Sequence, residues 1–224
     1  MKRSLPLQAA FGTMALLVSS SAFAQTWGEK GQLAISAERL FGFVHDSSTI
    51  SGNGGDATTK TDSFTFLSSN LGGGVLAFSQ PRVAGDYFVI DHLSVGAALG
   101  YSHISVSIPI NGNTSSSTSG DSWTFAPRAG WAFTFTDLIG IWPRAGFTYR
   151  SLSAGIEGSH VFGLTLEAPV TFTVIPHVVF WGGPTLDIGL TGSHDVDTGN
   201  NTTVSVDYNA TEIGIQTGLV ATIW

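Results

Sequence analysis

The side chains that could do acid–base chemistry lie in polar stretches of the sequence. Two histidines have hydroxyl or carboxyl neighbours: His103 with Ser102 or Ser105, and His160 with Glu157 and Ser159. A histidine can activate a serine nucleophile when the two come within hydrogen-bond reach and a third group orients the ring. The same residue types are common at strand ends and in loops. We therefore predict no catalytic residue and no enzyme activity, and keep these two groups as the enzymatic alternative.

A metal site has weaker support in the sequence. His194, Asp195 and Asp197 lie close together, with Asp187 a few residues before them. Their spacing is typical of a solvated loop rather than of a rigid ligand set. The chain has no cysteine, which excludes disulfides and thiolate ligands. We predict neither a metal nor a cofactor.

Composition restricts the class of protein that could position such residues. Charged residues make up only 11% of the chain and mean hydropathy is +0.23, whereas soluble domains have roughly 25% charged residues. The net charge of −7 argues against a nucleic-acid surface. No apolar stretch after residue 24 is long enough for a spanning helix. The chain is thus too apolar for a soluble domain but lacks a spanning helix. A closed transmembrane β-barrel accounts for both observations, because it places lipid-facing residues at every second position of many short strands.

The first 24 residues have the pattern of a signal peptide. Lys2 and Arg3 precede an apolar run from Phe11 to Val18, and Ala22 and Ala24 are the small residues expected before a cleavage site. We predict a signal peptide at 1–24 and a single barrel domain at 25–224.

Alternating hydrophobicity predicts an all-β, antiparallel up-and-down barrel of about eight strands. The expected strands are 31–45, 73–89, 93–107, 122–136, 140–153, 161–175, 178–191 and 204–223. The gaps between them alternate in length, with short turns near residues 91, 138 and 176 and longer polar loops at 46–72, 108–121, 154–160 and 192–203. Short periplasmic turns and longer outer loops are typical of outer-membrane barrels.

Residue parity predicts which face of each strand meets lipid. Alternate positions of the strand at 122–136 are large and apolar, and the positions between them are small or polar. The predicted lipid-facing aromatic residues are Phe125, Trp131, Phe133, Phe135, Phe147, Tyr149, Phe162 and Phe172. A soluble ligand-binding barrel would carry charge on its outer face instead, and it is the alternative to this assignment.

The same parity places most mid-strand charges in the lumen. The predicted lumen ionic network contains Glu38, Arg82, Asp86, Arg128, Arg144, Arg150, Glu167, Asp187 and Glu212. Buried opposite charges must pair, and an eight-stranded barrel is just wide enough to be filled by side chains. We therefore expect a lumen closed by arginine–carboxylate contacts, with a small gated pore as the alternative. Arg39 departs from the scheme, since its parity directs it toward lipid.

With these features assembled, the chain resembles OmpA/OmpX-type outer-membrane barrels, and more closely the small outer-membrane proteins of unassigned function. The run Ile35 to Gly42 and the hairpin segment Pro81 to Asp91 carry the second likeness. The resemblance implies that Trp224 is the terminal aromatic signal read by the barrel-assembly machinery. It also implies an outer-membrane location with lipids as partners and a structural or surface-interaction role. Some such barrels instead modify lipid A, and this activity is the enzymatic alternative. We expect a monomer that binds no nucleic acid and whose surface partner is unknown.

Overall fold

The computed structural model describes residues 27–52, 55–67, 69–70, 76–110, 114–154, 157–198 and 202–223. The signal peptide predicted at 1–24 and the assembly signal predicted at Trp224 lie outside these residues. No helix long and apolar enough to cross a membrane occurs in this described part of the chain.

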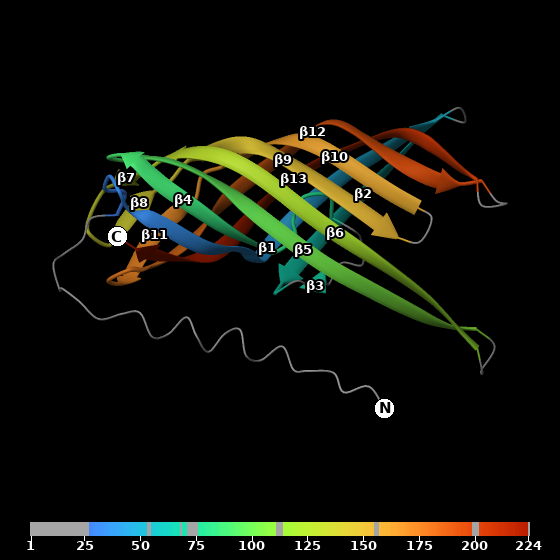
Figure 1. Cartoon of the computed structure of the whole chain (residues 1–224), viewed down its shortest axis with the longest axis horizontal. Helices are drawn as coiled ribbons and strands as arrows, with labels where there is room; N and C mark the ends of the chain where they lie inside the picture. Colours follow the sequence, from blue (N-terminus) through green and yellow to red (C-terminus); the bar gives the residue numbers. More distant parts are fainter. Residues whose placement is uncertain are drawn as a thin grey trace.

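Eight antiparallel strands form a closed barrel, which confirms the predicted fold. They comprise β1 (Leu33–Gly52), β4 (Arg82–Ile90), β5 (Leu93–Ile110), β6 (Thr114–Trp131) continued by β7 (Phe133–Thr134), β8 (Ile139–Ile141) continued by β9 (Arg144–Ala154), β10 (Glu157–Glu167) continued by β11 (Val170–Ile175), β12 (Val178–Asp197) and β13 (Thr203–Ile223). The barrel closes because β13 pairs with β12 on one side and with β1 on the other. The hairpin ends of β5–β6 and β12–β13 lie at the end of the molecule opposite β7, β8 and β11 (Figure 1).

Two prolines divide strands near the end of the barrel that carries β8 and β11. Pro143 separates β8 from β9, and Pro169 separates β10 from β11. Proline has no N–H to donate, so the regular ladder is interrupted where it occurs. Both proline carbonyls still accept hydrogen bonds, from the N–H groups of Trp131 and Trp142 respectively.

The outer connections differ from the predicted loops because strands extend into them. Residues 46–72 were predicted as a loop, yet β2 (Gly55–Phe66) forms a hairpin with β1 that runs from Phe41 opposite Phe66 to Gly52 opposite Gly55, followed by the short β3 (Ser69–Asn70). The loops predicted at 108–121, 154–160 and 192–203 are likewise largely paired strand. Threonine and serine favour this outcome, because threonine is β-branched and both residues pair well across strands on a solvated face.

The predicted strand 73–89 is wrong in its first part. The regular strand β4 begins only at Arg82, and residues 76–80 are buried inside the barrel without regular pairing. Residues 73–75 lie outside the described part of the chain. Pro81 breaks the ladder, and the polar groups of the preceding residues find partners within the lumen instead.

Arg39 points into the lumen rather than toward lipid. The pairing of β1 with β13 slips between Ala37 and Phe41, and Arg39 adopts a left-handed conformation with φ of 56°. A bulge of this kind turns an additional side chain to the same face as its neighbour, so both Glu38 and Arg39 are buried. The bulge is also where β1 exchanges β4 for β2 as its partner.

Candidate functional site: the barrel lumen

Glu38 is the centre of the ionic cluster in the lumen. Its two carboxylate oxygens lie 2.9 Å from Arg82 Nε, 2.6 Å from Arg128 Nη1 and 2.7 Å from Arg144 Nη1. All four side chains are almost completely buried. One carboxylate therefore accepts contacts from three arginines on three different strands, which the planar guanidinium fork makes possible.

Glu167 is the second carboxylate that several arginines share. It lies 2.6 Å from Arg82 Nη2, 2.7 Å from Arg144 Nη2 and 3.3 Å from Arg39 Nη2. Asp86 and Asp187 complete the cluster through Arg128 at 2.5 Å and Arg39 at 2.9 Å.

The cluster contains four arginines and four carboxylates, so its formal charges balance. Balance matters because an isolated buried ion costs several kcal/mol, and removing one partner from a buried pair leaves such an ion behind. All eight side chains are buried inside the wall; seven of them are residues that parity assigned to the lumen, and the eighth, Arg39, is brought inside by the backbone bulge.

The two other residues expected in the network have a different role. Arg150 donates to the Leu76 carbonyl and to Ser122 Oγ, and Glu212 accepts the Phe78 N–H at 2.7 Å. Both are buried, but neither forms an ion pair within the described residues. They instead hold residues 76–80, which we call the lumen plug.

The lumen plug is held along its whole length. Arg39 donates to the Phe78 carbonyl at 2.8 Å, and Gln216 donates to Ser79 Oγ at 2.6 Å. Gln80 donates to Thr124 Oγ1 at 2.5 Å. Arg39 thus joins the ionic cluster to the plug. Sequence parity could not find this segment, because its partners come from strands distant along the chain.

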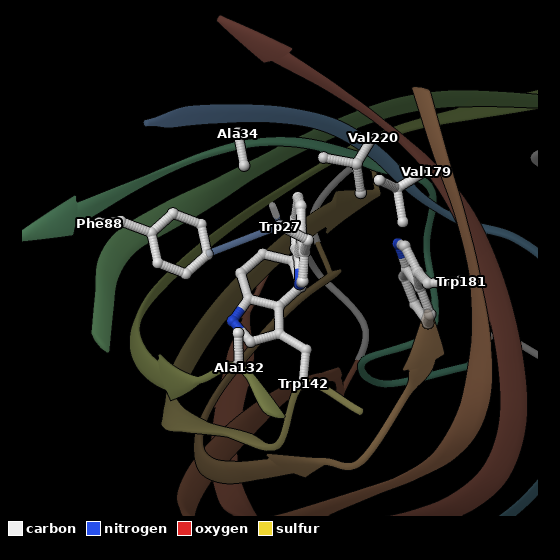
Figure 2. Close-up of a cluster of buried hydrophobic side chains, with 8 residues drawn as sticks. All are labelled: Trp27, Ala34, Phe88, Ala132, Trp142, Val179, Trp181 and Val220. Atoms are coloured by element: carbon white, nitrogen blue, oxygen red, sulfur yellow. The ribbon is translucent and has the colours of Figure 1, made fainter. Parts of the chain in front are cut away.

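A third, apolar layer fills the end of the lumen that lies near β8 and β11. Trp27, from the segment before β1, packs edge-on against Phe88 and Trp142 with ring centroids 5.4 and 5.0 Å apart (Figure 2). Trp181 belongs to the same cluster, and the Arg144 guanidinium lies 4.5 Å from the Trp142 ring and 5.0 Å from the Trp181 ring. These cation–π contacts connect the apolar layer to the ionic cluster.

The eight aromatic residues assigned to lipid all face outward. Phe135 is 69% exposed, for example, whereas Trp142 in the lumen is 0% exposed. Tyr149 is half-buried, since its ring packs against Trp123. The described wall therefore has aromatic rows on its outside and buried charges within.

The histidines considered for catalysis lie at the outer end of the wall. His103 Nδ1 is 2.8 Å from Asp121 Oδ1, while Ser102 faces the lumen plug and donates to Gln80. His160 lies 3.3 Å from Ser193 Oγ. The side chains of Ser105 and Glu157 are outside the described part. Among the described residues, no group of three potential metal ligands is brought together.

Asp121 lies on β6, nearer to the β5–β6 hairpin end than Trp123. Its titration tests the hydrogen bonds that it accepts. Hydrogen bonds from His103 and Tyr101 lower the pKa of its carboxyl group. Its interaction energy is therefore present above the usual carboxyl pKa of about 3.9 and is lost as pH falls through the lowered value. Carbon NMR of the Asp121 carboxyl in micelles should give a midpoint below that of a free aspartate. The double change Tyr101→Phe and His103→Gln should raise the midpoint; an unchanged midpoint would contradict the assigned hydrogen bonds.

No family model matches the chain, and no curated protein matches its sequence. Its structure is similar to the outer membrane protein OprG of Pseudomonas aeruginosa, with a TM-score of 0.54 and 10% identity over 89% of this chain and 99% of that one. It is also similar to the outer membrane protein AlkL, with a TM-score of 0.54 and 10% identity over 100% of this chain and 97% of that one.

At this identity the likeness establishes the fold. The chain is an eight-stranded β-barrel of the outer-membrane type. Its wall carries the belt of exposed large apolar side chains that a barrel of the outer membrane requires. This belt argues against the soluble ligand-binding barrel that the sequence left open, since such a barrel would carry charge on its outer face.

Proposed function

We propose that this protein is a non-conducting, non-enzymatic barrel with a structural or surface-interaction role, acting as a monomer in outer-membrane lipid. This proposal rests on three layers of side chains that fill the lumen: the apolar layer, the ionic cluster and the lumen plug. Each layer involves residues from opposite sides of the wall. A conducting path would require all three to rearrange.

The long outer hairpins support the surface role. The β1–β2, β5–β6 and β12–β13 hairpins continue well beyond the aromatic belt, and their outer ends are rich in serine, threonine and asparagine. Exposed polar segments on a rigid scaffold are where interaction sites commonly lie. In this proposal the barrel anchors the hairpins and the filled lumen stiffens the anchor.

Planar-bilayer recording tests the closed lumen. The refolded wild-type protein should give no stepwise current at moderate voltage, while a porin reconstituted in parallel gives steps and shows that insertion is detected. Heat-modifiable gel mobility should establish that the reconstituted protein is folded. Reproducible steps from the wild-type protein would reject this proposal in favour of the gated pore.

A further inference from the structure

Two grooves lie on the outer surface of the wall formed by β12, β13, β1 and β2. The first is apolar, with a volume of about 690 Å³, and its lining includes Phe43, Phe64, Pro184, Ile213 and Ile215. Pairing places Pro184 beside Ile215, Ile215 beside Phe43, and Phe43 beside Phe64, so this row crosses four strands at one level. Its volume is within the roughly 300–1,000 Å³ typical of small-molecule sites.

The second groove is polar and lies farther out on the same strands. It has a volume of about 340 Å³, and its lining includes Thr49, Ser51, Asp207 and Asn209. Thr49 pairs with Asn209 and Ser51 with Asp207, in the same β1–β13 ladder that carries the apolar row. Thr49 follows Phe43 by six residues, which corresponds to about 20 Å along a strand.

The parity of the two ladders puts both grooves on one face. Phe43, Thr49 and Ser51 are separated by even numbers of residues, and so are Ile215, Asn209 and Asp207. Phe43 is among the most exposed apolar side chains of the protein, so this face is the outside of the barrel. The His45–Asp62 pair, with Nδ1 and Oδ1 2.6 Å apart, lies between the two levels at the rim of the apolar groove.

The charges of the polar groove indicate the headgroup that it would accept. Its lining offers hydroxyl groups, an amide and one carboxylate, and none of its lining residues is a lysine or an arginine. Such a set can donate to and accept from sugar hydroxyls, whereas a phosphate would meet the Asp207 carboxylate without a compensating cation.

We propose that this face binds one glycolipid of the outer leaflet, with an acyl chain in the apolar groove and sugar residues in the polar groove. The membrane location supplies an amphiphile of this chemistry and orientation. The inference goes beyond the proposed function, because it assigns a ligand site to the outer wall rather than to the lumen or the hairpin tips.

The test uses the full chain refolded from denaturant without native lipid. The protein is inserted into phosphatidylcholine vesicles that contain a few per cent of lipopolysaccharide with inner-core sugars, or of phosphatidylglycerol, and is re-extracted in mild detergent. We expect about one lipopolysaccharide retained per barrel and no comparable retention of phosphatidylglycerol, which lacks sugar. Equal retention of the two lipids would overturn the proposal.

Variants locate the site. Ile213→Trp fills the apolar groove and Asn209→Ala removes an amide from the polar one, and each should lower retention by about tenfold, as expected for a lost pocket contact. Leu99→Trp and Ser153→Ala, on β5 and β9, are the matched controls and should retain lipid as the wild type does. Heat-modifiable mobility establishes folding, and Ile215→Trp serves if Ile213→Trp does not fold. Because the proposal needs both grooves, loss in only one variant, or in neither, would overturn it.

Discussion

Glu38→Gln should be the most destabilising single change in the ionic cluster. The carboxylate contacts Arg82, Arg128 and Arg144 within 2.9 Å, and the amide leaves the four buried arginines of the cluster with only three carboxylates. Removing one partner from a buried ion pair typically costs about 3–5 kcal/mol. Urea unfolding of the refolded protein in micelles, followed by tryptophan fluorescence and gel mobility, measures the change.

Asp56→Asn is the matched control for this substitution. Asp56 is exposed on β2 and has no ion pair among the described residues, so the same loss of a carboxylate should change the unfolding free energy by less than about 0.5 kcal/mol. If Glu38→Gln and Asp56→Asn destabilise the barrel equally, the ionic cluster does not stabilise the fold as described.

Trp142→Ala should produce the second large effect. The side chain is completely buried between Trp27, Phe88 and the Arg144 guanidinium, so its removal leaves a cavity and ends a cation–π contact. Truncating a buried tryptophan typically costs about 3–5 kcal/mol. The same urea titration should show it.

Trp131→Ala provides the comparison for the outer face. Trp131 is 40% exposed on the lipid side, where detergent or lipid fills the space that the indole leaves. We expect the free energy of unfolding to fall by about 1 kcal/mol, because part of the favourable transfer of the indole out of water is lost but no cavity forms. A Trp131→Ala variant less stable than Trp142→Ala would contradict the division between lumen and lipid faces.

The wall of the barrel could be predicted from sequence because it depends on local rules. A strand has a side-chain period of two, so the row containing Phe125, Trp131 and Phe133 fixes its own lipid face without knowledge of its neighbours. The charges opposite that row, such as Arg128, follow from the same parity. The number of strands followed from the same alternation, and the up-and-down topology from the alternating lengths of the gaps.

The contents of the lumen depend on contacts that parity does not encode. Arg39 enters through a bulge, which shifts the side-chain period at one residue. The lumen plug has no strand pattern, since its N–H and C=O groups are satisfied by side chains such as Arg150 and Glu212. Trp27 lies before the first strand, and only the folded barrel shows that it enters the lumen.

Apolar side chains coat the outside of the barrel, and buried side chains fill its inside. Because the chain contains no cysteine, single cysteines can be introduced at adjacent positions of one strand and given nitroxide labels. Phe125 is 42% exposed on the lipid face and Thr124 is 0% exposed in the lumen, so these two positions separate the faces most directly. Electron paramagnetic resonance in vesicles should show high oxygen collision rates and a mobile label at Phe125→Cys, and low rates with an immobilised label at Thr124→Cys. Oxygen collision rates that are higher at Thr124→Cys than at Phe125→Cys would contradict the assignment of the lipid and lumen faces.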